Sequence, residues 1–448
     1  MHRLAIASLA LLLPSLTSLA SQPVSHWDLQ EVDAQGAPVH PLVGAAPQTE
    51  NRIVLEGVVL NNWEDMLDPT AAWSTVVGDM GGQWQIYVAG TGDDSGGTAL
   101  WMGQNYGNRP WMRDPSLNYT DTEWQAELQR LGYTSAGRPI RRGDAVRVNG
   151  YALEYGGKAN INERHNTDEM MNFTVEWLGH PGVGVPQVIT MTDVMNPDDG
   201  DPATAEDIFD PTRATGGERY QSRLVRIEDV RFADDSRQAV VADGRSLPIA
   251  WGRHPSLADL SALDETFDVV GIFDQEGSGP QATDGYRLWV LGYDGSADTL
   301  GTPRGDLSGN TDVYMEDVTL LQQAVLAGDE PGVTTDLTGD GLLDSADVDH
   351  LVEQIIGSRP GDANLDWSVS LADLSTLAAN WGGSADWSGG DFNSDGTVSL
   401  ADLSALVAHW GHHAWPPASQ TPTSVPEPAS LLTLTAALAA LAARQKRF

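Results

Sequence analysis

Four stretches in the last third of the chain place oxygen-bearing side chains at alternate positions and then continue into an apolar pattern. The clearest are "GDFNSDGTVSLADLSALVAHWG" (390–411) and "GDANLDWSVSLADLSTLAANWG" (361–382). Two looser versions are "GDLSGNTDVYMEDVTLLQQAV" (305–325) and "TDLTGDGLLDSADVDHLVEQII" (335–356). A tight turn can direct alternate side chains toward one point, so such a pattern is typical of a hard-cation site.

Counted from the first Asp, positions 1, 3 and 5 carry side-chain oxygens in all four copies, and position 12 is always Asp. Position 7 supplies a backbone carbonyl in loops of this kind, and position 9 often acts through water. Calcium accepts about six to eight oxygens in a flexible shell, whereas magnesium needs a stricter octahedron and zinc prefers His or Cys. We therefore predict Ca²⁺ as the cofactor, with these metal ligands: Asp306, Ser308, Asn310, Asp312, Asp317, Asp336, Thr338, Asp340, Leu342, Asp344, Asp347, Asp362, Asn364, Asp366, Ser368, Asp373, Asp391, Asn393, Asp395, Thr397 and Asp402.

A helical pattern follows position 12, because Leu403, Leu406, Val407 and Trp410 recur at helical spacing and Gly411 stands where the helix would end. No periodic apolar helix precedes the loops. A loop followed by one helix, repeated after 30 residues (Asp306 to Asp336) and 29 residues (Asp362 to Asp391), resembles the type I dockerin module. The resemblance implies two small all-α calcium-loop modules, at 303–358 and 360–412, and a cohesin-like protein partner.

Some positions depart from that pattern. Position 6 favours Gly for its sharp turn, but Thr311 and Trp367 stand there in the first and third loops, which should weaken them. Positions 10 and 11, where dockerins contact cohesins, are mostly Leu-Ala or Ser-Ala here, which departs from the hydroxyl or basic residues common in that family. The alternative interpretation is that these are Asx-rich turns capping ordinary helices.

Composition narrows the possible partners. The 448 residues include 63 Asp plus Glu but only 25 Lys plus Arg, for a formal charge of −38, which makes nucleic acid an unfavourable partner. The chain has no cysteine, so disulfides and thiolate metal sites are excluded. Its length predicts several domains.

Both ends carry export signals. Residues 1–20 combine Arg3, an apolar run and a small-x-small cleavage pattern, as a signal peptide does. Residues 413–424 form a Pro/Ser/Thr linker. In the tail, 425–448, "VPEP" precedes a 15-residue apolar run and a basic end. Such a helix is about 22 Å long against a hydrocarbon core of roughly 30 Å, so it makes at most a marginal or transient membrane anchor.

The tail resembles the PEP-CTERM protein-sorting signal. That resemblance implies a Gram-negative bacterium, export through the inner membrane, processing by an exosortase-type enzyme and a secreted or cell-surface location, in the context of extracellular polysaccharide.

Short predicted strands fill the chain between the ends. After an extension at 21–50, two β domains of about five strands each are predicted at 51–185 and 186–300, with an Asp/Pro-rich join or long loop at 195–218. Their architecture resembles the OB-fold barrel, and a pair of jelly-roll or immunoglobulin-like sandwiches is the alternative. The predicted fold class is multi-domain: mainly β, then all-α calcium-loop modules, then a C-terminal apolar helix.

No catalytic motif is evident. Ser95 in "DSGG" has no matching His motif, His165, His180 and His254 lack metal-ligand spacing, and Trp84, Trp101, Trp177, Trp251 and Trp289 fit a core better than a sugar site. We predict an exported calcium-binding protein that acts as a non-catalytic component of an extracellular assembly. The alternatives are an accessory subunit or enzyme of polysaccharide degradation and, less favoured by the charge, a nucleic-acid-binding OB protein.

Overall fold

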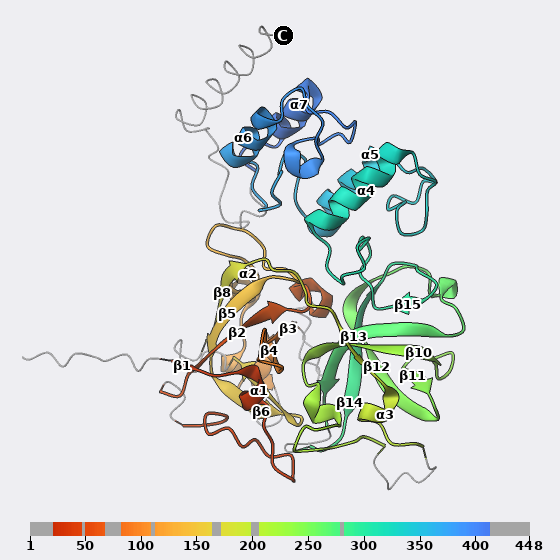
Figure 1. Cartoon of the computed structure of the whole chain (residues 1–448). Coiled ribbons are helices and arrows are strands. Elements are labelled where there is room, and N and C mark those ends of the chain that lie inside the picture. The colour runs from red at the N-terminus through yellow and green to blue at the C-terminus, as the bar shows by residue number, and fades with distance from the viewer. Residues whose placement is uncertain are drawn as a thin grey trace, which may run out of the picture.

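The computed structural model describes residues 21–46, 50–67, 82–108, 113–163, 172–198, 206–277 and 282–412. These residues form two β-sheets that lie side by side, with a loop-rich helical region above them (Figure 1). The strands are β1 (Gln22–Pro23), β2 (Ile53–Val59), β3 (Gln83–Ala89), β4 (Gly97–Gly103), β5 (Ala145–Gly150), β6 (Ala152–Tyr155), β7 (Lys158–Asn162), β8 (Thr174–Gly179), β9 (Gln187–Ile189), β10 (Arg223–Phe232), β11 (Ala239–Ala242), β12 (Arg245–Leu257), β13 (Phe267–Gln275), β14 (Tyr286–Tyr293) and β15 (Thr299–Leu300).

The helices are fewer and mostly short. The α-helices are α1 (His26–Leu29), α2 (Asp121–Gly132), α3 (Met191–Val194), α4 (Met315–Ala327), α5 (Ser345–His350), α6 (Leu371–Ala379) and α7 (Leu400–Ala408). The 3-10 turns are Trp63–Met66, Tyr106–Asn108, Pro115–Leu117, Gly217–Arg219, Leu260–Ala262 and Trp387–Gly389, and Leu351–Ile356 is π-helical. No described helix has both the length and the apolar character needed to cross a membrane. The apolar run in the tail lies outside the described residues.

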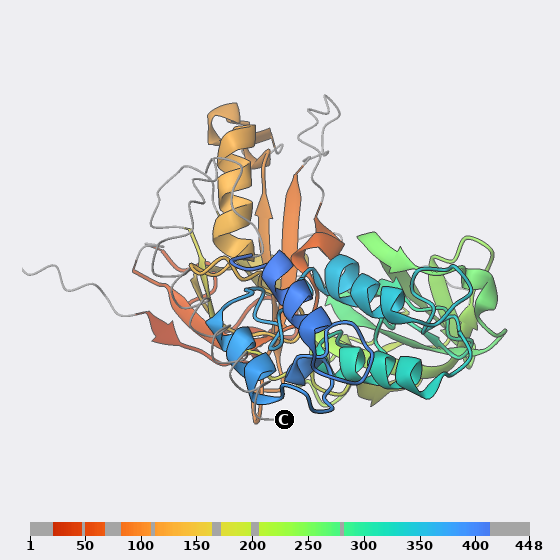
Figure 2. The same cartoon turned by 90° about the horizontal axis from the view of Figure 1, so that it is seen from above.

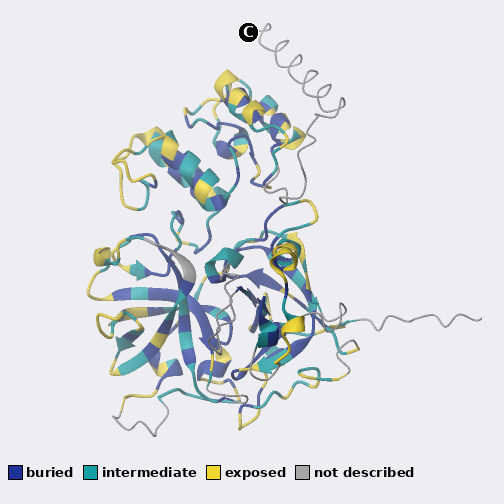
Figure 3. Cartoon of the chain, turned by 180° about the vertical axis from the view of Figure 1, so that it is seen from behind, coloured by how far each residue is buried: buried dark blue, intermediate teal, exposed yellow. Residues whose placement is uncertain are grey.

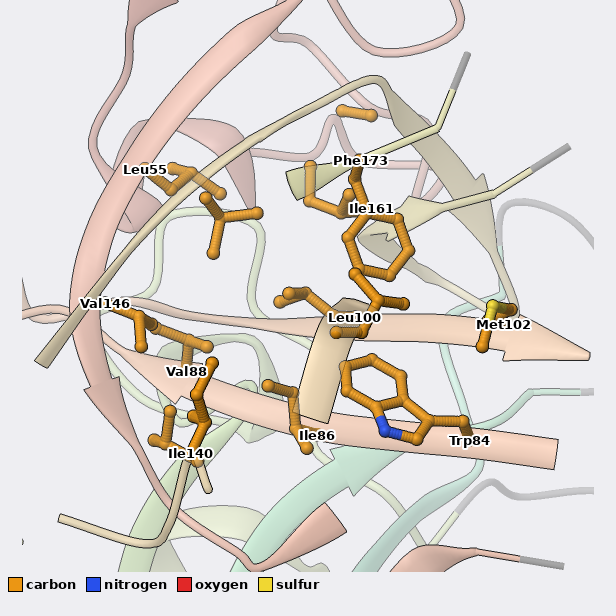
Figure 4. Close-up of a cluster of buried hydrophobic side chains, with 14 of the residues drawn as sticks. Leu55, Trp84, Ile86, Val88, Leu100, Met102, Ile140, Val146, Ile161 and Phe173 are labelled. Atoms are coloured by element: carbon orange, nitrogen blue, oxygen red, sulfur yellow. The ribbon is translucent and has the colours of Figure 1, made fainter. Parts of the chain in front are cut away.

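The first sheet has eight strands in the order β6-β7-β4-β3-β2-β5-β8, with β1 pairing β2 in parallel. Its inward side chains form a closed apolar core, in which Trp84, Leu100 and Phe173 are fully buried (Figure 4). The ring centroids of Trp84 and Phe173 lie 5.9 Å apart. Burying rings of this size supplies much of the stability of a small β unit.

The second sheet has seven strands in the order β15-β13-β14-β12-β11-β10-β9, and β13 also pairs with β10. That extra pairing closes β10, β11, β12, β14 and β13 into a ring around a second apolar core. In β10, Val225 and Ile227 are buried in this core, while Leu224, on the opposite face of the strand, is buried in a cluster shared with the first sheet.

Buried contacts join the two sheets. A small apolar cluster combines side chains of both, including Tyr87 of β3 and Ile272 of β13. Beside it, the ammonium group of Lys158 on β7 forms a buried ion pair with Asp274 on β13, and donates a hydrogen bond to the carbonyl of Gln275. Arg287 also binds Asp274, at 2.9 Å. The β region is thus one body with a partly polar internal interface.

The segment predicted as an extension packs onto the sheets. Leu29 and His26 on α1 are fully buried, and β1 adds to the edge of β2. The side chain of Arg213, from the second half of the β region, contacts the Trp27 ring at 3.9 Å.

The predicted fold class is wrong for residues 303–412, because they do not form small all-α modules. Helices α4 to α7 are separated by longer loops, and one cluster of buried side chains runs from Val318 to Leu406, through both predicted modules. A nine-residue helix such as α6 or α7 presents too little apolar surface for a core of its own, so these helices pack together around one shared core. Seen from above, they lie across both β units (Figure 2), and exposed residues gather on their outer side (Figure 3).

Candidate metal centre

All four Asp-rich loops share one hydrogen-bond pattern at position 1. One carboxylate oxygen of that Asp accepts a bond from the backbone N–H at position 5, and the other accepts one from position 6. For position 6 the N–H donors and lengths are Thr311 at 2.7 Å, Gly341 at 2.9 Å, Trp367 at 2.8 Å and Gly396 at 2.8 Å. For position 5 they are Asn310 at 3.2 Å, Asp340 at 3.2 Å, Asp366 at 3.1 Å and Asp395 at 3.2 Å. Each loop is therefore folded around its first carboxylate.

The Asp at position 12 closes each loop. It is the third residue of the following helix, and its Oδ2 accepts a bond from the backbone N–H of position 9, forming a capping box. Its Oδ1 accepts from the loop entrance, as in the 2.9 Å bond from the N–H of Phe392 to Asp402. The helix start and the loop start are therefore joined by one carboxylate.

Position 6 has a left-handed backbone in every loop. The φ angle is 83° at Gly341 and 82° at Gly396, but also 67° at Thr311 and 63° at Trp367. A bulky residue adopts this region rarely, so Trp367 needs compensating contacts. Its buried indole donates a 3.1 Å hydrogen bond to the carbonyl of Ile356.

In three of the loops the carboxylates at positions 1 and 12 are both buried and repel each other electrostatically. Asp391 and Asp402 are both fully buried, as is Asp362. Burial, reinforced by the neighbouring position-12 carboxylate, raises the pKa of Asp306 to about 6, of Asp362 to about 7 and of Asp391 to about 6. The hydrogen bonds alone would also serve a plain helix cap. The repulsion between two buried carboxylates, however, is what a bound divalent cation would neutralise.

The first two loops differ from the last two. In the first loop, the position-7 side chain of Asp312 points toward the β region, 3.1 Å from Nε2 of His180. The second loop is the most exposed: Thr338, Asp340, Leu342 and Asp344 all lie at the surface. There desolvation raises the pKa of Asp336, but the backbone hydrogen bonds from Gly341, Gly339 and Asp340 together outweigh it, so the pKa is lowered.

The donor types suit calcium, although the described residues include no group of three or more His, Cys, Asp or Glu side chains placed to hold a metal ion. The loops instead mix Asp with Asn, Ser and Thr oxygens, as hard-cation loops do. Leu371 and Leu400, at position 10 of the last two loops, are 50% and 65% exposed.

Aromatic and cation–π contacts join the first loop to the β region, and the sequence did not predict them. The Tyr314 ring lies 3.9 Å from that of His180 and also stacks on Trp367. The Arg138 guanidinium contacts the rings of Trp367, at 4.4 Å, and Trp177, at 4.6 Å. No local sequence motif indicates these contacts, because they join residues far apart in the sequence.

Other residues singled out from the sequence have structural surroundings. Trp84 is fully buried, as expected for a core residue, whereas Trp177 is 39% exposed and lies against Arg138. Ser95 lies exposed in a turn. His165 lies outside the described residues.

Comparison with known proteins identifies one motif. The model of the PEP-CTERM protein-sorting motif matches residues 424–447. The match confirms the predicted sorting tail and supports an exported, cell-surface-sorted protein that is processed by an exosortase-type enzyme. No curated protein matches the chain. The dockerin and OB-fold resemblances are not confirmed.

Proposed function

We propose that this exported protein binds calcium through its four Asp-rich loops, and that the bound ions stabilise residues 303–412. The observation that carries the proposal is the repeated pairing of position-1 and position-12 carboxylates, as in Asp391 and Asp402, which are buried together without an ion-pair partner among the described residues. Bound calcium would neutralise that repulsion. The β region then serves as a non-catalytic binding or structural head, and the sorting tail is removed at the inner membrane.

The loops supply the oxygen atoms in this proposal. The Asp residues at positions 1 and 12 are the charged ligands, and the side chains at positions 3 and 5 add neutral or acidic oxygens. The loop backbone is already held by the N–H bonds to the position-1 carboxylate. A preformed loop lowers the ordering cost of binding.

Isothermal titration calorimetry with CaCl₂ tests the proposal on the intact chain. We expect calcium uptake, weaker uptake of MgCl₂, and a lower calcium stoichiometry in the double variant Asp362→Ala plus Asp391→Ala. The matched control is Asp329→Asn, an exposed residue after α4 that belongs to no loop. The proposal fails if the wild-type chain takes up no calcium, or if the double variant and the control take up equal amounts.

The non-catalytic role is supported by how the β region uses its buried titratable groups. Glu163 accepts a hydrogen bond from the Tyr119 hydroxyl, and Glu218 accepts one from Tyr286 at 2.6 Å. Both carboxyls are thus engaged in core pairs. Release of reducing sugar from polysaccharides by the purified chain would contradict this role, whereas glycan-array binding without turnover would support it.

A further inference from the structure

A cavity lies where the two β-sheets meet the helical region. Its volume is about 330 Å³, at the small end of ligand sites. The cationic side chains of Arg141, Arg142, His180 and Arg304 line it, beside the carboxyl groups of Glu64, Asp65 and Asp312. This concentration is notable in a chain that carries only 25 Lys plus Arg among 448 residues.

Three of these four cations have protein partners. Arg141 binds the carboxylate of Glu64 at 2.6 Å. His180 lies 2.9 Å from Asp144 and 3.1 Å from Asp312. Arg304 donates a 2.8 Å hydrogen bond to the carbonyl of Leu337.

Arg142 is the exception. Its side chain is buried, with only 7% of the residue exposed, and its Nε and Nη2 atoms have no hydrogen-bond acceptor among the described residues. Leaving charged donors buried without an acceptor is costly, so such a group calls for a partner. The nearby carboxyls of Asp65 and Asp312 act on Arg142 through space only, and burial raises the pKa of Asp65 to about 7, which weakens its negative charge near neutral pH.

The two unsatisfied atoms form one edge of the guanidinium group. Elsewhere in this protein the same Nε and Nη2 edge holds a carboxylate: Arg130 binds Glu127, Arg226 binds Asp268 and Arg287 binds Asp274 in this way. The geometry of this edge matches carboxylate and phosphate oxygens and does not match a spherical ion equally well.

We infer that this cavity binds a small oxyanion, a carboxylate or phosphate group, at the unpartnered guanidinium of Arg142. The cavity volume suits a small-molecule ligand and leaves room for a molecule about the size of a monosaccharide acid. The inference does not depend on calcium binding, although Asp312 and Tyr314 of the first loop help to line the cavity.

Binding is tested on the intact chain at constant ionic strength, with calcium present for the carboxylates and left out for phosphate, which would otherwise combine with the calcium. Sodium acetate, sodium glucuronate and inorganic phosphate are titrated by calorimetry, with sodium chloride as the reference. We expect at least one oxyanion to bind and to raise the thermal midpoint above that in chloride. Binding of carboxylates alone, of phosphate alone or of both identifies the source of the oxyanion, and each supports the site.

Two variants locate the binding. Arg142→Gln removes the charge and Arg142→Lys keeps the charge but not the two-donor edge, so each should weaken the affinity by about tenfold or more. Arg147→Gln, on the exposed face of β5, is the charge-matched control and should bind as the wild type does. The inference is overturned if no oxyanion binds beyond chloride, or if Arg142→Lys and the control bind equally well. Should Arg142→Gln fail to fold, the wild-type titrations and Arg142→Lys still decide.

Discussion

The carboxylate of Asp312 lies 3.1 Å from Nε2 of His180, which ties the first Asp-rich loop to the end of the first sheet. The other imidazole nitrogen of His180 lies 2.9 Å from Asp144. One histidine therefore bridges a carboxylate of the β region and a carboxylate of the loop. The Tyr314 ring, in contact with the imidazole, covers this bridge.

Replacing His180 should loosen the helical region from the sheets. Each hydrogen bond to a charged group is worth about 1.5 to 3 kcal/mol, so His180→Ala, which removes two, should cost about 3 to 6 kcal/mol and lower the thermal midpoint by several degrees. Differential scanning calorimetry measures the shift, and His350→Ala on α5 is the control. Equal midpoints for the two variants would show that the bridge contributes nothing to stability.

Calcium removal should destabilise residues 303–412 and leave the β region folded. Saturating a site at 100 times its Kd stabilises the folded state by about 2.7 kcal/mol, and this contribution disappears with a chelator. We expect helical circular dichroism of the intact chain to melt at a lower temperature in EGTA than in CaCl₂. Unchanged melting in the two buffers would contradict a stabilising role for the ion.

Glu163 should make stability depend on pH. Burial raises its pKa from 4.5 to about 7, so the folded state holds the proton more tightly than the unfolded state does. Its contribution to stability is present below about pH 4.5 and is lost as the pH rises through about 7. Relative to the wild type, Glu163→Gln should therefore gain up to about 3 kcal/mol between pH 4.5 and pH 8.

Urea denaturation at pH 5 and pH 8 measures this difference. Glu218→Gln gives a parallel test in the 3-10 turn before β10, because burial raises the pKa of Glu218 to about 7 as well. A stability difference from the wild type that stays flat between the two pH values would refute the assignment.

The buried ion pair of Lys158 and Asp274 should be costly to break. Lys158→Met leaves a fully buried carboxylate with Arg287 as its one ion-pair partner among the described residues, beside a hydrogen bond from the Trp289 indole. Losing one partner of a buried pair costs about 3 to 5 kcal/mol. The urea midpoint should fall accordingly, whereas Arg147→Met, in an exposed ion pair, should change it little. Restoration of much of the loss in Lys158→Met plus Asp274→Leu would confirm that the unpaired charge is the cause.

Much of the β region is predictable because its strands have alternating or continuous apolar residues between turn signals. The apolar run at 286–293 predicts a strand, which coincides with β14, and the run at 52–60 predicts another, which contains β2. Helix α2 was missed, although Thr120 and Glu123 form the capping box that marks its start. β7 was also missed, since Lys158 and two Asn residues obscure its apolar pattern.

The loops are predictable in their local spacing but not in their packing. The left-handed turn at position 6 follows from the Gly residues of two loops, and the structure places Thr311 and Trp367 in the same conformation. The shared core of residues 303–412 was not predictable from the sequence. Helical periodicity identifies the apolar face of each helix but not the helix against which that face packs. For the same reason the sequence does not indicate that Arg142 and Arg304 line one cavity.

Gln322 on α4 has a consequence for how the loops respond to calcium. Its buried amide donates a 2.8 Å hydrogen bond to the carbonyl of Asp391 in the fourth loop and accepts one of 2.6 Å from the N–H of Trp387. The helix that follows the first loop is thus hydrogen-bonded to the last loop, and the helices after all four loops share one core. Ion uptake is therefore expected to be cooperative, with one steep transition replacing four independent ones.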